Sequence, residues 1–322
     1  MLIRAVLHRI ATGLVTLIVV SVLIFLGTSV LPGDVASIIL GQMATPESLA
    51  ALRSTLGLDQ PAYVRYFLWL GDLFSGDLGI SKAGAGSGTG GTPISEMIAP
   101  RLINTVQLAG AVALIAVPLS LGLGLVAATY PGTRLDRSIT LSTLGLVSVP
   151  EFLVATALVL VVAVYLGWLP ATAYVSGTET GMALLKTLAL PTLTLVIVAS
   201  SQIIRMTRAS VLNVMSSPYI EMAVLKGLPR RRIVLHHALP NAVGPIVNVI
   251  ALNLAYLISG VVIVETIFAY PGLAKLMVDA VQTRDLPLVQ ACAMIFCSAY
   301  ILLVFIADLA SILSNPRLRY PR

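Results

Sequence analysis

Long apolar runs separated by short polar segments dominate the chain. A helix rises about 1.5 Å per residue, so about 20 apolar residues are needed to cross ~30 Å of hydrocarbon. Runs of that length lie near residues 10–31, 104–129, 141–168, 187–207, 243–264 and 288–313. The pattern predicts an all-α integral membrane protein with six transmembrane helices, an even number that places both termini on the same side of the membrane.

The first apolar run could be mistaken for a secretory signal peptide, because Arg4 and Arg9 precede it. The run is too long for one, however, and it ends in TSVLPGD, which contains no small-x-small cleavage pattern. We therefore interpret it as a retained anchor helix. Residues 1–31 would form the N-terminal cytoplasmic end and the first span, residues 32–100 a long periplasmic loop, and residues 101–322 a core with the other five spans.

The predicted periplasmic loop holds one helix signal and one linker signal. In TPESLAALRSTLGLD, Thr45 can cap a helix, Pro46 suits its first position and Glu47 favours its positive end. Residues 84–91 are glycine-rich, but they lack the preceding strand and the following Lys-Ser/Thr of a phosphate-binding loop. This stretch is typical of a flexible linker, and the sequence assigns it no further role.

Composition and charge agree with a membrane protein. The chain is 57% hydrophobic and 11% charged, whereas a soluble domain carries about a quarter charged residues. Thirteen of its twenty basic residues fall on the side of the termini: Arg4, Arg9, Arg134, Arg137, Arg205, Arg208, Lys226, Arg230, Arg231, Arg232, Arg317, Arg319 and Arg322. Such an excess marks the cytoplasmic side, so both termini are predicted to be cytoplasmic. Nucleic-acid binding is not predicted, because no basic domain with interleaved aromatic residues is present.

The sequence shows no motif for catalysis or for binding a metal or nucleotide. The histidines are His8, His236 and His237, whose spacing forms no closed metal site, and no GxSxG elbow occurs. In GLGLVAA, at residues 122–128, the glycines fit close helix contact better than a nucleotide site. We therefore predict a protein that is not an enzyme and binds neither a cofactor nor a metal.

The segment 207–242, between the fourth and fifth predicted spans, is basic yet regularly patterned. An apolar stripe at helical spacing runs along it, formed by Val211, Met215, Tyr219, Met222 and Leu225. Such a stripe must be covered, which favours docking of another protein. The alternative is that Arg230, Arg231 and Arg232 anchor the segment to anionic lipid.

The same segment carries the signals of two short helices. Ser217 and Pro218 can begin the first helix, and Gly227 can end it in the left-handed conformation. A second helical piece is predicted from Pro229 to about residue 238, before Pro240 interrupts the backbone. Two short helices hinged at Gly227 would form a compact cytoplasmic protrusion.

The spacing of this segment resembles the cytoplasmic loop of the permease subunits of ATP-binding-cassette importers. Their pattern is E-A-A, three residues, G, nine residues and I-x-L-P. Here Glu221, Met222 and Ala223 are followed by Gly227, and the chain continues to HALP at residues 237–240. Met222 and His237 depart from the pattern. In this family the loop is similar to a coupling helix seated in a groove of the ATPase subunit.

A second resemblance is more specific. ETIFAYPGLAKLMVDAVQTRDLPLVQA, at residues 265–291, is similar to the segment before the last span in the dipeptide and oligopeptide branch. LPGD, GDLGIS and RMTRASVL are further shared pieces. The resemblance implies a type I importer permease fold in a bacterial inner membrane. It also implies a second permease subunit, two ATPase subunits that bind ATP and Mg, and an extracytoplasmic substrate-binding protein. Importers of nickel, glutathione and opines share this branch.

Three groups of candidate site residues follow. The resemblance assigns coupling to the ATPase to Glu221, Met222, Ala223, Leu225, Gly227, Leu239 and Pro240. A periplasmic segment at 265–287, where Pro271 and Gly272 would force a turn, gives Glu265, Phe268, Pro271 and Gly272 as candidates at the mouth. Polar residues within the spans give Glu151, Gln202 and Asn253 as pathway candidates.

Simpler interpretations remain open for each group. Glu151 can instead sit at the positive end of a helix that Pro150 restarts, or pair with a neighbouring subunit. The segment 265–287 can be a packed loop without a gating role. For the whole chain, the alternatives are a self-sufficient secondary transporter or channel, and a membrane-anchored scaffold.

Overall fold

The computed structural model describes residues 2–30, 45–55, 59–81, 91–175, 181–259 and 261–314. These residues are almost entirely helical, and their only β-pairing is an isolated antiparallel bridge between Ile80 and Pro93. Most of the predicted glycine-rich linker lies outside the described residues.

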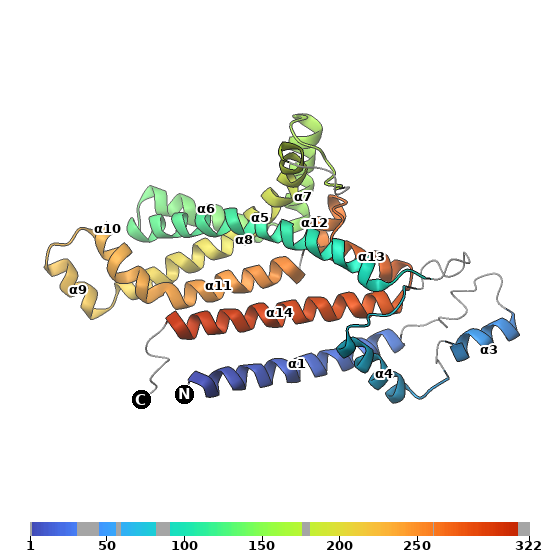
Figure 1. Ribbon diagram of the computed structural model, residues 1–322. Coiled ribbons are helices and arrows are strands. Elements are labelled where there is room, and N and C mark those ends of the chain that lie inside the picture. The colour runs from blue at the N-terminus through green and yellow to red at the C-terminus, as the bar shows by residue number, and fades with distance from the viewer. Residues whose placement is uncertain are drawn as a thin grey trace. The chain divides into compact units, whose positions relative to one another are not determined.

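The helices follow the order in Figure 1. They are α1 (Leu2–Val30), α3 (Pro46–Thr55), α4 (Ala62–Ser75), α5 (Ile94–Thr129), α6 (Arg134–Ser148), α7 (Glu151–Leu158), α8 (Met182–Met215), α9 (Pro218–Leu225), α10 (Arg230–Arg232), α11 (Leu239–Ser259), α12 (Val262–Ile267), α13 (Leu273–Gln282) and α14 (Leu286–Ser314). Two π-helical segments, Val159–Tyr165 and Ile233–Ala238, continue α7 and α10. The predicted all-α class is confirmed.

Five helical stretches among the described residues are long and apolar enough to cross a membrane, or six if a bent pair counts as one span. They contain α1, α5, α8, α11 and α14 and coincide with five of the predicted runs. The helices begin earlier than hydropathy indicates: α5 starts at Ile94 rather than near residue 104.

The third predicted span, 141–168, is not one straight helix. α6 and the helix from Glu151 to Tyr165 meet at an angle of 101°. Val149 is extended, and Pro150 lies at the N-terminal cap of α7 with φ −58° and ψ 143°. A proline restricts the residue before it to extended conformations, so α6 ends at Ser148 and a new helix starts in another direction. The stretch is apolar enough for a span, as predicted, but the bend is not predicted by its hydropathy.

The chain forms two compact units. The first contains Met1–Ala11, Val106–Pro271 and Ala299–Arg322, and the second contains Thr12–Thr105 and Gly272–Ser298. In the first unit α11 and α6 both pack against α8. Gly124 on α5 allows this unit to pack tightly, because a Cβ built there would lie 2.7 Å from Cβ of Thr207 on α8. The predicted close helix contact at 122–128 therefore exists at Gly124.

The second unit is fastened by polar contacts between helices and loops. Gln290 on α14 donates to the hydroxyl of Thr28 on α1 at 2.6 Å. Ser81, beside the β-bridge, donates to the carboxylate of Asp285. The predicted start of α3 is confirmed, because the hydroxyl of Thr45 accepts a hydrogen bond from the amide of Ser48. The predicted periplasmic loop also contains a second helix, α4, which the sequence signals did not indicate.

Candidate functional site

The short helix α9 has the boundaries that its sequence predicts. Pro218 occupies its first position, and the chain leaves the helix at Gly227, whose φ is 73°. The amide of Gly227 donates to the carbonyl of Val224 at 2.9 Å, and the amide of Leu228 donates to the carbonyl of Ala223 at 3.3 Å. This pair of hydrogen bonds is a Schellman motif, which needs a left-handed residue and so favours glycine.

The cap at the start of α9 differs from the prediction. Ser217 lies at the N-cap position, but its hydroxyl donates backwards to the carbonyl of Val214 and makes no capping hydrogen bond to α9. The predicted single stripe is also wrong. Since α8 ends at Met215 and α9 starts at Pro218, the stripe is divided between two helices.

α9 has one buried face and one exposed face. Ile220 and Ala223 are 1% and 8% exposed. They belong to a hydrophobic cluster with Ala128 of α5, Val211 of α8 and Ile233, Val234, Ala238, Ala242 and Ile246 from the π-helix and α11. Outward lie Met222 and Leu225, whose exposed fractions are 56% and 79%. Glu221 is exposed as well. A helix fixed on its inner side thus presents an apolar outer side.

Pro240 does not interrupt the backbone as predicted. The helix runs from Arg230 through the π-helix Ile233–Ala238 into α11, and Pro240 lies in the first turn of α11. A proline lacks the amide hydrogen and its ring collides with the preceding turn of an α-helix. The wider π-turn just before Pro240 can relieve that collision.

At His237, which departs from the family pattern, the backbone carbonyl makes the observed contacts. The carbonyl of His237 accepts a hydrogen bond from the hydroxyl of Tyr219 on α9 at 3.2 Å and one from Nδ2 of Asn241 at 2.9 Å. The contact from Tyr219 links the two short helices. Because the backbone provides it, it does not depend on the side chain at position 237.

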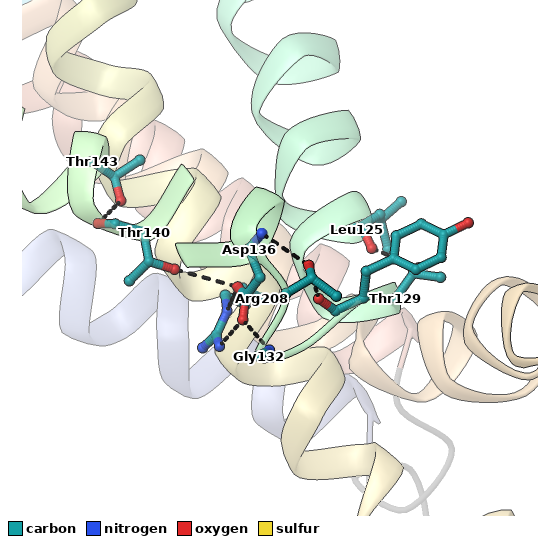
Figure 2. Close-up of polar contacts among 9 residues, drawn as sticks. Leu125, Thr129, Gly132, Asp136, Thr140, Thr143 and Arg208 are labelled. Carbon is teal, nitrogen blue, oxygen red and sulfur yellow. Dashed lines mark hydrogen bonds and ion pairs between the residues drawn. The ribbon is translucent and has the colours of Figure 1, made fainter. Parts of the chain in front are cut away.

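An ion pair lies where α6 meets α8 (Figure 2). Nε and Nη2 of Arg208 donate to the two carboxylate oxygens of Asp136 at 2.6 and 2.9 Å. Asp136 also accepts a hydrogen bond from the amide of Gly132 at 2.8 Å. Its side chain is only 4% exposed, against 28% for Arg208. Bidentate pairs of this kind are the stronger charged contacts in proteins.

The sequence interpretation missed Asp136. A usable signal exists, because a Thr followed three residues later by an acidic residue is a helix-start pattern. The structure follows it: Thr133 caps α6, and its hydroxyl accepts from the amide of Asp136 at 3.3 Å. The partner Arg208 is 72 residues away, which no local pattern indicates.

The three pathway candidates have different surroundings. Oε2 of Glu151 accepts a hydrogen bond from the hydroxyl of Tyr256 on α11 at 2.6 Å. Oε1 of Glu151 is buried and has no hydrogen-bond partner within the described part of the chain. Glu151 also lies in the first turn of α7, so the two interpretations of it both stay open. Gln202 is exposed, and Nδ2 of Asn253 donates to the carbonyl of Val249 in its own helix.

The candidates at the predicted periplasmic mouth are buried. Glu265 and Phe268 are both 0% exposed, and Pro271 and Gly272 are buried too. The carbonyl of Phe268 accepts a hydrogen bond from the amide of Ala173 at 2.6 Å. This geometry suits a packed segment.

The turn in this segment is not built as predicted. Gly272 is extended, with φ −96° and ψ 179°, and caps α13. The left-handed residue is Ala269, with φ 51°. Its amide donates to Thr266, and the next amide, of Tyr270, donates to Glu265. The chain therefore reverses in a Schellman motif before it reaches Pro271.

Two further features bear on chemistry. Arg9 and Asp308 form an ion pair at 2.9 Å, which links α1 to α14. Among the described residues no three His, Cys, Asp or Glu side chains are grouped so that they could hold a metal.

Known proteins match the chain over almost its whole length. Residues 120–320 match the binding-protein-dependent transport system inner membrane component, and residues 2–109 match the N-terminal membrane component of these systems. The probable peptide ABC transporter permease protein y4tP of Sinorhizobium fredii is 35% identical over 98% of this chain and 99% of its own length.

Further relatives and a solved structure agree. A putative peptide transport system permease protein of Brucella melitensis is 36% identical over 99% of this chain and all of its own length. The glutathione transport system permease protein GsiC of Salmonella paratyphi A is 35% identical over 98% of both chains. The inward-facing MetNI methionine ABC transporter shares the fold, with a TM-score of 0.51 and 17% identity over 70% of this chain and 97% of that chain. This chain therefore belongs to the binding-protein-dependent transport system inner membrane components, the permease subunits of ABC importers.

Proposed function

We propose that this chain forms half of the translocation pathway of an ATP-driven importer for di- and oligopeptides. The substrate class is supported by the names of two relatives, which are called peptide permeases. The name of the GsiC relative makes glutathione the second candidate. A second permease subunit would complete the pathway, an extracytoplasmic binding protein would deliver the substrate, and two ATPase subunits would hold ATP and Mg. The chain itself would carry out no covalent chemistry.

The exposed apolar side of α9 is the observation that carries this proposal. Met222 and Leu225 are more than half exposed, whereas Ile220 and Ala223 hold the helix on the core. An apolar surface on a well-anchored helix suits insertion into a groove of a partner protein. Figure 1 shows α9 and α10 at one end of α8 and α11. A displacement of α9 by the ATPase would therefore pass to both of these helices, because a packed interior transmits strain.

The roles of the motif residues differ on this proposal. Met222 and Leu225 would contact the ATPase, and Glu221 would face an Arg of the partner or complement the N-terminus of α9. Ala223 would act through its small size in the core, and Gly227 through its left-handed turn. Leu239 is half-buried and Pro240 exposed at the start of α11, where they would set the direction in which the protrusion joins the span.

Replacing an outward residue of α9 tests the coupling role. A Leu225→Glu change leaves the buried face of α9 intact but places a charge where an apolar contact is expected. We expect the importer purified in mild detergent to lose its ATPase subunits while it keeps the second permease, and we expect ATP-dependent uptake to fall at least about tenfold, since losing one well-packed contact costs 1–2 kcal/mol or more. Arg231→Glu, exposed on α10, is the matched control and should retain the ATPases.

A second variant addresses the hinge. Gly227→Asp should abolish uptake while the protein is still inserted, because a side chain is strained at φ 73°. Normal uptake by this variant would contradict the coupling role of the α9 turn. Uptake of dipeptides, longer peptides, glutathione and Ni²⁺ by the unmodified importer would then decide between the substrates. Uptake that persists without the ATPase subunits would favour a secondary transporter.

A further inference from the structure

The helix α4 has an aromatic face that no described part of the chain covers. Tyr63, Phe67 and Phe74 are 67%, 66% and 81% exposed. Their spacing of four and seven residues places them within about 40° of one another around the helix, so they form a single stripe. The helix carries only one basic and one acidic residue, Arg65 and Asp72. Its surface is therefore mainly apolar, except for the polar backbone groups at the two helix ends.

The other side of α4 is attached to α1. The rings of Tyr66 and Trp69 lie 5.5 and 6.0 Å from the ring of Phe25 on α1. The hydroxyl groups of Tyr66 and Ser21 are hydrogen-bonded at 2.9 Å. Arg65 lies over the same Phe25 ring at 6.0 Å. These contacts fix which face of α4 is turned away from α1.

The level of these contacts along α1 indicates what surrounds α4. α1 is apolar from Val6 to Val30. Phe25 and Ser21 lie five and nine residues before Val30, which is about 7 and 13 Å along the axis. α4 is therefore packed beside the apolar part of a span rather than above its end. At this level α1 itself exposes apolar side chains, with Leu23 and Leu26 62% and 48% exposed.

We propose that α4 lies in the membrane interface and that its stripe of Tyr63, Phe67 and Phe74 binds lipid. Tyr, Trp and Phe prefer the boundary between headgroups and acyl chains. The leaflet is the one at the Val30 end of α1, which is the outer leaflet if the termini are cytoplasmic. Part of the predicted periplasmic loop 32–100 then belongs to the membrane.

Fluorescence quenching tests this placement in the full chain, purified with the subunits that accompany it. The chain has two tryptophans, so the same complex with Trp69→Phe and Trp168→Phe gives the emission of the other subunits, which is subtracted to leave the emission of Phe67→Trp. In vesicles whose lipids carry bromine near the headgroup end of the acyl chains, we expect the emission to fall to about half or less of its value in unbrominated lipid, since an interfacial side chain touches those atoms. Iodide in the water should have little effect. Ala50→Trp on the polar helix α3 is the control and should respond to iodide only.

Two outcomes would overturn the proposal. Quenching of Phe67→Trp by iodide but not by brominated lipid would place the stripe in water, free for a soluble partner. Quenching by neither would mean that another subunit covers it. If Phe67→Trp fails to insert, Phe74→Trp in the same background gives the same comparison. The readout does not depend on transport, so it is independent of the proposed importer function.

Discussion

Among the described helix ends that close with the same pair of backbone hydrogen bonds, three have different residues in the left-handed position. They are Gly227 after α9, Ala269 after α12 and Arg284 after α13, with φ of 73°, 51° and 54°. The sequence predicts the first, because glycine takes this conformation without strain. It does not predict the second. The neighbouring Phe268 and Tyr270 are both buried, at 0% and 1% exposure, and we infer that their packing holds Ala269 in this conformation.

Replacing Ala269 tests that account. A left-handed L-residue costs about 1–2 kcal/mol, and glycine loses up to about 1 kcal/mol through its greater freedom when unfolded. Ala269→Gly should therefore stabilise the purified protein by about 1 kcal/mol or less, seen as a higher midpoint of thermal unfolding. Ala274→Gly inside α13, where the backbone is helical, is the matched control and should lower the midpoint. A lower midpoint for Ala269→Gly would show that its methyl group contributes more through packing than its backbone loses.

At the scale of elements, the sequence locates helices better than it joins them. Pro150 carries a clear local signal for a helix boundary. Averaged hydropathy carries no information on the direction of a helix, so it predicts one span at 141–168, although the two helices there meet at 101°. The prediction of one helical stripe from Val211 to Leu225 is wrong for a related reason. The apolar spacing continues across Ser216 and Ser217, where one helix ends and the next begins. The contacts that settle these angles are made by residues far apart in sequence.

The ion pair of Asp136 and Arg208 is the clearest such contact between α6 and α8. Arg208→Met leaves the nearly buried Asp136 charge without its partner, so we expect a loss of about 2 kcal/mol in stability. Asp136→Asn should cost less, because an amide oxygen can still accept from Gly132. Thermal unfolding of both variants and of the double variant measures the coupling between them. Arg205→Met, exposed one turn earlier on α8, is the control. Additive losses in the double variant would mean that the pair contributes no energy of its own.

For the whole molecule, composition alone predicted the class of protein, and the resemblance predicted the family that the comparisons then confirmed. Candidate sites were less predictable. The exposed residues of α9 follow from a local pattern, whereas Glu151 meets Tyr256 over 105 residues of sequence. The prediction that residues 32–100 lie outside the membrane gives no reason to expect an exposed aromatic face on α4. A single apolar stretch of fourteen residues is too short to span, so a search for spans passes over it.

The orientation of the whole chain follows from its basic residues and stays a prediction. Loops rich in Lys and Arg stay on the cytoplasmic side of the membrane. The α9–α10 protrusion, which contains Lys226, should therefore face the cytoplasm, and the end of α13 should face the periplasm. In a background without Cys292 and Cys297, Lys226→Cys and Gln282→Cys place single thiols at two exposed positions. A membrane-impermeant maleimide should label Gln282→Cys in cells with a permeable outer layer. It should label Lys226→Cys only after the inner membrane is opened. The reverse pattern would place α9 where no ATPase could reach it, and the proposed coupling surface would fall with the orientation.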